Sequence, residues 1–171
     1  MSAKTPKEVF VMLLSNARNH TERSIKGYET IGQNVENPDV KEALKARQFV
    51  AKENLRTLDE CFEMIGEKPV QVSGKMQEVF IEDFKRELAE IQEPAARQLY
   101  VLAKLTHLAY LRFAEYSALI AAADATGNYG VGILLESVLP DKPVNLERDR
   151  RLVRHLMAGR VKERLAERHA A

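Results

Sequence analysis

The chain has 171 residues, 45% apolar and 30% charged, which suits one soluble globular domain rather than a disordered chain. Its 26 basic and 25 acidic residues leave a net charge of +1. The overall charge therefore gives no reason to expect binding to nucleic acid or to an anionic membrane. No apolar run reaches the roughly 20 residues of a membrane span, and the N-terminal residues lack the features of a secretory signal. The single cysteine, Cys61, excludes an internal disulfide, so we expect a cytoplasmic protein in which Cys61 is a small core residue.

Capping and stop signals predict two long helices in the first part of the chain. Thr5-Pro6-Lys7-Glu8 is a capping box with proline in the first turn, and apolar residues at spacings of three and four follow it to Ile31. Asn37-Pro38-Asp39 then caps a second helix, which ends at Gly66 with Pro69 just beyond.

The remaining chain is divided in the same way. A third helix is expected over about 75–92 and a fourth, apolar on most of its circumference, over about 95–126. A short helical piece is expected near 133–139, before two prolines, and a last helix over about 145–168. No segment has the alternation of a strand. We therefore predict one all-α domain, an up-and-down four-helix bundle over about 6–139 with an additional C-terminal helix.

Three stretches carry a family resemblance: NPDVKEAL at the start of the second helix, LDECFEMIGEKP at its end, and AEYSALIAAADATG in the fourth helix. Together they resemble the YciE/YciF family of ferritin-like proteins, over about residues 6–139. The resemblance implies a ferritin-like bundle, often dimeric, that is linked by name to bacterial stress responses and has no established reaction.

Many ferritin-like bundles hold two metal ions, which need about four carboxylates and two histidines, including Glu-x-x-His pairs on one helix face. None of the four histidines here has an Asp or Glu three or four residues away, so no such pair exists in any register. They are His20, His107, His155 and His169.

Aligning the helix ends on Gly66 and Gly127 places other residues at the candidate ligand positions. They are Thr21 in the first helix, Arg47, Val50, Ala51 and Asn54 in the second, and Ala109, Tyr110 and Arg112 in the fourth. We therefore predict that the two-metal centre is lost, with an interior filled by hydrocarbon, and we assign no catalytic, cofactor-binding or metal-binding residue. The alternative is that Arg47 or Arg112 neutralises a leftover core carboxylate, Glu22 or Glu53.

Three further features of the helices give expectations. The arc of Lys104, His107, Arg112 and Glu115 is expected to be the exposed face of the fourth helix. A seam of small residues on that helix permits close contact within the bundle or across a dimer: Ala103, Ala114, Ser117, Ala118 and Ala121. Gly27 is expected to mark a close approach of another helix.

Residues 141–171 hold nine bases and five acids, which could touch nucleic acid. The bases alternate with acids and with an apolar stripe, so we expect this tail to pack on a bundle, its own or a partner's.

The leading hypothesis is a non-enzymatic structural or protein-interaction bundle that forms a homo-oligomer, most simply a dimer. Its association with stress responses is what the family resemblance implies. One alternative is a metal-binding or redox protein with iron or manganese in a non-standard site. Another is a module for a small apolar molecule, with a cavity lined by Leu55, Tyr110 and Phe113.

Overall fold

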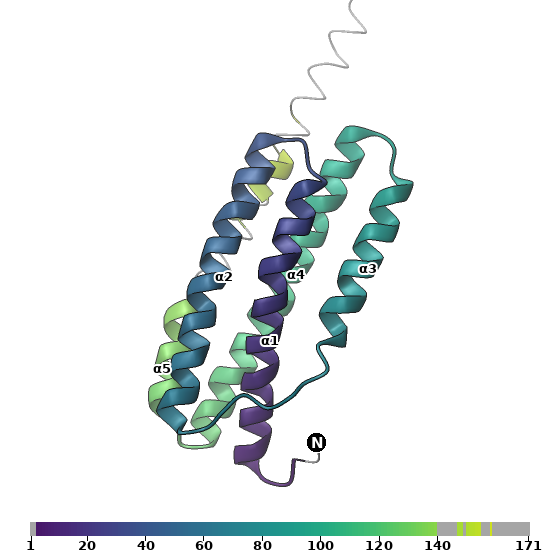
Figure 1. Ribbon diagram of the computed structural model, residues 1–171. Coiled ribbons are helices and arrows are strands. Elements are labelled where there is room, and N and C mark those ends of the chain that lie inside the picture. Colours follow the sequence, from purple (N-terminus) through teal and green to yellow (C-terminus); the bar gives the residue numbers. More distant parts are fainter. Residues whose placement is uncertain (1–2, 140–146, 149, 155–157, 159–171) are drawn as a thin grey trace, which may run out of the picture.

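The computed structural model of the chain describes residues 3–139, 147–148, 150–154 and 158 (Figure 1). Its helices are α1 (Pro6–Gln33), α2 (Pro38–Ile65), α3 (Lys75–Glu90), α4 (Pro94–Ala125) and α5 (Tyr129–Val138). The described residues contain no strand, and α1 to α4 run in alternating directions, which confirms the predicted all-α bundle. No described helix is both long enough and apolar enough to cross a membrane.

The helices begin where the capping signals place them. Thr5 Oγ1 accepts a hydrogen bond from the Glu8 amide at 3.2 Å, and the Glu8 carboxylate accepts one from the Thr5 amide, which completes the capping box of α1. At α2, Asn37 Oδ1 accepts from the amides of Asp39 and Val40. The start of α5 differs from the prediction: it begins at Tyr129 rather than near Ile133, directly after the turn that ends α4.

The link over residues 66–74 places α3 on one half of the bundle only. Figure 1 shows this link crossing in front of α1 and reaching α3 partway along the bundle. Gly27 of α1 faces α3, and a Cβ there would lie 3.1 Å from Ile81 Cδ1. The expected close approach at Gly27 is thereby confirmed.

Two apolar cores fill the two ends of the bundle. The lower core, at the bottom of Figure 1, is closed by Val131 and Leu135 of α5, and the upper core by Phe84 and Leu88 of α3. The other members of the lower core are Phe10, Val11, Leu14, Ala17, Leu58, Cys61, Phe62, Tyr116, Leu119 and Ala123. Those of the upper core are Tyr28, Ile31, Val35, Val40, Leu44, Ala51, Val101, Leu102, Leu105 and Leu108.

The helix predicted over about 145–168 lies mostly outside the described residues. Those of its residues that are described are helical, and Leu152 and Val153 pack against the upper core. Arg148 pairs with Glu42 of α2 at 3.1 Å, and Arg150 donates to the Tyr110 hydroxyl of α4 at 3.3 Å. For these residues, the prediction that the tail packs on a bundle is confirmed, and the bundle is its own.

Candidate functional site

A layer of buried polar side chains separates the two apolar cores. We call it the polar layer; it consists of His20, Thr21 and Ser24 of α1, Arg47 and Asn54 of α2, and Arg112 of α4, each at most 8% exposed. The expectation of a purely hydrocarbon interior is wrong at this level. The alignment on helix ends was informative, however, since Thr21, Arg47, Asn54 and Arg112 all point into the bundle rather than to solvent.

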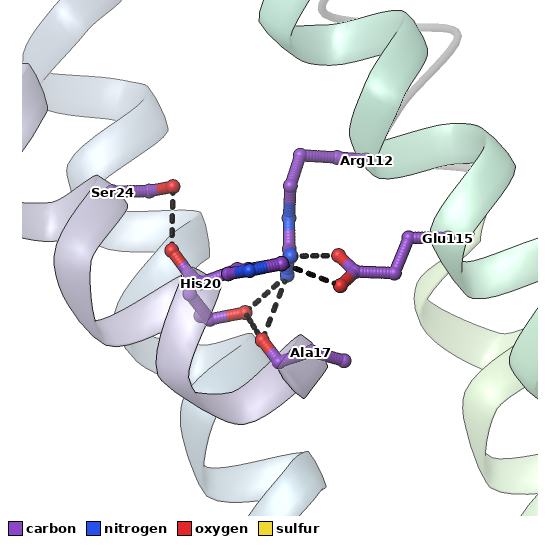
Figure 2. Close-up of polar contacts among 6 residues, drawn as sticks. Ala17, His20, Ser24, Arg112 and Glu115 are labelled. Carbon is purple, nitrogen blue, oxygen red and sulfur yellow. Dashed lines mark hydrogen bonds and ion pairs between the residues drawn. The ribbon is translucent and has the colours of Figure 1, made fainter. Parts of the chain in front are cut away.

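Arg112 ties α4 to α1. Its guanidinium donates to the backbone carbonyl of Ala17 at 3.2 Å and to the Thr21 hydroxyl, and it forms an ion pair with Glu115 one turn further along α4 (Figure 2). Thr21 in turn donates its own hydroxyl proton to the Ala17 carbonyl at 2.8 Å. These bonds satisfy a charge that would be costly to bury alone.

Glu115 also reaches across to α1. Its Oε1 lies 2.7 Å from Nδ1 of His20, so one carboxylate bridges a histidine and an arginine. The side chains of Glu115 and His20 are 18% and 10% exposed, which places the group at the edge of the interior. The expectation that Arg112 and Glu115 lie on an exposed face is therefore wrong, although His107 is exposed as expected.

The carboxylates proposed from sequence as partners of the buried arginines lie elsewhere. Glu22 pairs with Arg18 at 3.6 Å, and Glu53 pairs with Arg56 at 2.8 Å. Sequence reasoning missed Glu115 and His20 as members of the site. The available signal was Glu115 three residues after an inward-facing Arg112, with His20 directly before the inward-facing Thr21.

A cavity of about 40 Å³ opens in the polar layer. It is bounded by three helices, α1, α2 and α4, and its lining includes the positions that the sequence alignment on helix ends gave as candidate ligand positions: Thr21, Arg47, Val50, Ala51, Asn54, Ala109 and Arg112. Its lining residues are Thr21, Ser24, Tyr28, Arg47, Val50, Ala51, Asn54, Ala109 and Arg112. Leu55, Tyr110 and Phe113 do not line it, so the apolar-ligand alternative gains no support here.

The residues at this position do not fit a pair of divalent cations. Two guanidinium groups would repel them, and the described lining residues include no carboxylate, histidine or cysteine. Among the residues that the structure describes, no three His, Cys, Asp or Glu side chains gather closely enough to hold a metal. In the part of the chain that the structure describes, the His–carboxylate contact is that of His20 with Glu115, and this carboxylate is already bound to Arg112.

Burial makes two titratable side chains of the lower core, Tyr116 and Cys61, hard to deprotonate. Burial raises the pKa of the Tyr116 hydroxyl, although the Arg112 guanidinium carbon lies 5.2 Å from the centre of its ring. Burial also raises the pKa of Cys61 to about 12, so this fully buried thiol is no nucleophile at neutral pH.

Comparisons with known proteins agree with this architecture. The E. coli stress protein YciF superposes with a TM-score of 0.85 at 18% identity, covering 91% of this chain and 99% of that one. YcfI from Rhodopseudomonas palustris, described as "a putative structural protein", gives 0.81 at 18% identity, covering 86% and 94%. A protein from Xanthomonas campestris gives 0.68 at 18% identity, covering 98% and 100%.

The sequence comparisons divide in two. No curated protein sequence matches the chain significantly. A protein-family model described as "Domain of unknown function (DUF892)" matches residues 5–163, nearly the whole chain. With an all-helical fold that superposes on YciF, the chain belongs to this DUF892 family and is a ferritin-like helical bundle of the YciE/YciF type.

Proposed function

We propose that this protein is a non-enzymatic, stress-associated structural or protein-interaction bundle in which the two-metal centre of ferritin-like proteins has been replaced. The observation that carries the proposal is the chemistry of the polar layer. Where metal ligands would converge, this chain presents Arg47, Asn54 and Arg112. Guanidinium groups repel the metal cations that redox chemistry needs, and one amide group is not enough to hold them. We therefore assign these side chains to contacts between helices and not to redox chemistry.

The names of two structural neighbours fit this proposal. YciF is described as a stress protein and YcfI as a structural one. We extend the stress setting and the structural role of these two proteins to this chain only as part of the proposal.

Metal analysis tests the proposal directly. Protein purified without chelator would be assayed for iron, manganese and zinc, beside an authentic ferritin-like metalloprotein carried through the same purification. We expect well under one ion per chain, and no rise in the thermal unfolding midpoint on adding Fe²⁺ or Mn²⁺. Two ions bound per chain, with a stabilisation that saturates, would overturn the proposal in favour of an iron or manganese protein.

The proposal includes a cytoplasmic homodimer. Support for association comes from the small-residue seam of α4, where Ala103, Ala114, Ala118 and Ala121 are exposed and leave room for another helix to approach. Support for a reducing compartment comes from the one free cysteine, Cys61.

Light scattering across a concentration range gives the oligomeric state. We expect a dimer for the native chain and a monomer for Ala118→Arg, which puts a long charged side chain on the seam. Glu60→Arg, an exposed position on α2, is the control with an arginine away from the seam. A native monomer at all concentrations would contradict this part of the proposal.

A further inference from the structure

Three large apolar side chains are exposed together at the lower end of the bundle, where α5 lies beside α2 (Figure 1). Met64 of α2 is 52% exposed, and Tyr129 and Ile133 of α5 are 65% and 69% exposed. Tyr129 and Ile133 are four residues apart and share one face of α5. Met64 adjoins the same helix, since a Cβ on Gly130 would lie 2.8 Å from Met64 Cε. We call Met64, Tyr129 and Ile133 the lower-end patch, and such a group on a globular protein marks a contact site.

Acidic residues surround the lower-end patch. Glu63 and Glu136 are exposed next to its members on α2 and α5. Asp124 of α4 is exposed too, and its Oδ1 lies 2.9 Å from the point where Gly132 of α5 would carry a Cβ. None of these three carboxylates has an ion pair among the described residues.

The bases at this end of the bundle do not cancel the acids. Lys7 is already paired with Glu67 at 2.6 Å, and Lys68 is the exposed base nearest in sequence to Met64. The lower-end patch is therefore apolar with a net negative rim. Charge complementarity favours a partner segment that is apolar on one face and basic around it.

The chain itself contains a segment of this kind. Residues 159–171 hold four bases and two acids. Val161 and Leu165 are four residues apart, so they share one face of the helix that the sequence predicts there. The bases are Arg160, Lys162, Arg164 and Arg168.

A helix over residues 159–171 is too short to reach the lower-end patch of its own chain. Leu152 and Val153 pack against the upper core, at the opposite end of the bundle from α5. The 28 residues of α2, which connects the two ends, span about 42 Å, whereas residues 159–171 as a helix would span about 20 Å. In an antiparallel pair of chains, however, the upper end of each lies beside the lower end of the other.

We propose that residues 159–171 of each chain dock on the lower-end patch of a second copy, with Val161 and Leu165 on its apolar side chains and the bases beside Glu63 and Glu136. In an antiparallel dimer with two-fold symmetry this contact is made twice. Apolar burial supplies the free energy, and the opposite charges select the partner and the orientation. The inference rests on the homodimer of the proposed function and gives that dimer a direction.

Disulfide cross-linking between two full-length variants tests the inference. Ile133→Cys is mixed with Leu165→Cys, oxidised, and analysed on a non-reducing gel and by mass spectrometry of the linked peptides. Burial raises the pKa of the native Cys61 to about 12, so this thiol does not compete. A disulfide between positions 133 and 165 in this mixture necessarily joins two copies, and we expect it to be the main cross-linked product.

A matched variant gives the background of random collisions. Phe49→Cys replaces an apolar residue of similar exposure, 65%, and it lies about 22 Å along α2 from Met64. Mixed with Leu165→Cys, it should give a several-fold lower yield of cross-linked chains. Equal yields from the two mixtures would overturn the proposal. So would a 133–165 disulfide that forms only within single chains of the double variant Ile133→Cys/Leu165→Cys, because the chain's own tail would then be the occupant.

Charge reversal tests the role of the acidic rim. Arg164→Glu and Arg168→Glu, added to the Leu165→Cys chain, should lower the yield several-fold. Glu63→Arg and Glu136→Arg, added to the Ile133→Cys chain, should restore it with the reversed tail. A yield that ignores both reversals would overturn the charge-matched contact.

Light scattering separates this inference from the proposed function. A dimer that forms no disulfide between positions 133 and 165 would overturn the tail contact and leave the proposed dimer intact. A monomer at all concentrations would overturn both.

Discussion

Glu115 of α4 and His20 of α1 lie 2.7 Å apart, Oε1 to Nδ1, and the same carboxylate holds Arg112 in the polar layer. One side chain thus connects two helices and positions a buried cation. Since Arg112 also donates to the Ala17 carbonyl and to Thr21, these five residues form one hydrogen-bonded group between the two apolar cores. In such a group each polar side chain is a hydrogen-bond partner of another, so removing one member leaves buried polar groups without a partner.

Arg112→Met should therefore destabilise the bundle strongly. The change leaves Glu115 and the Ala17 carbonyl without their cationic donor, and breaking a mostly buried pair costs about 3 kcal/mol. Arg56→Met, which breaks the Arg56–Glu53 pair with side chains 77% and 45% exposed, should cost less than about 0.5 kcal/mol. Urea unfolding measures both. The double variant Arg112→Met/Glu115→Leu should recover part of the loss, and equal costs for the two arginines would show that the polar layer does not stabilise the fold.

The sequence predicted the helices well because their signals are local. The Thr5–Glu8 capping box, the Asn37 cap and Gly66 each act within one turn, and the structure places each helix end within a few residues of them. The burial of Arg112 and Glu115 on α4 was harder to predict. Arg112 and Glu115 have the polarity of surface residues, and only the partners that α1 supplies, His20 and Thr21, explain their burial. A contact between residues more than 90 positions apart leaves no periodic signal in either helix.

The interior of the polar layer was only half predictable. Counting back from Gly66 and Gly127 located Arg47, Asn54 and Arg112, because helical geometry fixes the register over several turns. The same counting could not show that the side chains would enclose a cavity rather than fill it. Packing at that level depends on the rotamers of long side chains from three helices.

Cys61 should report on unfolding through its reactivity. Burial raises the pKa of its thiol to about 12, whereas an unfolded thiol has a pKa of about 8.5, so the folded state keeps the proton more tightly. The stability that this provides is fully present below about pH 8.5 and is lost as the pH rises toward 12. We expect thiol labelling at pH 8 to be slow in the folded protein and fast in urea. Rapid labelling of the folded chain would contradict the buried position, and the difference in stability between Cys61→Ala and the native chain isolates the pH effect.

The two left-handed glycines around the α2–α3 link should differ in their tolerance of a side chain. Gly66 has φ +64° with nothing within 4 Å of an added Cβ, so Gly66→Ala should cost only the backbone strain, about 1 kcal/mol. Gly74 has φ +59°, and its Cβ would lie 2.5 Å from Asn19 Oδ1 and Arg23 Nε. Gly74→Ala should therefore cost distinctly more, because it also displaces Arg23, which pairs with Glu78 of α3. Denaturant unfolding compares the two, and equal losses would mean that Asn19 and Arg23 move aside freely.

The attachment of α3 to α4 should weaken in acid through Glu87. Hydrogen bonds from Lys104, at 2.7 Å, and from the Tyr100 hydroxyl lower the pKa of Glu87, and the hydrogen bond to Glu87 raises the pKa of Lys104. A carboxylate with a lowered pKa in the folded state stabilises it above the unfolded pKa, about 4.3, and loses this contribution as the pH falls through the folded value. The stability difference between the native chain and Glu87→Gln should therefore be constant at neutral pH and vanish in acid. Glu90→Gln removes the same charge from the same helix at an exposed residue with no ion pair among the described residues, and should show no such change. Identical pH profiles for the two variants would mean that the charge of α3, and not the contact with Lys104 and Tyr100, sets its acid response.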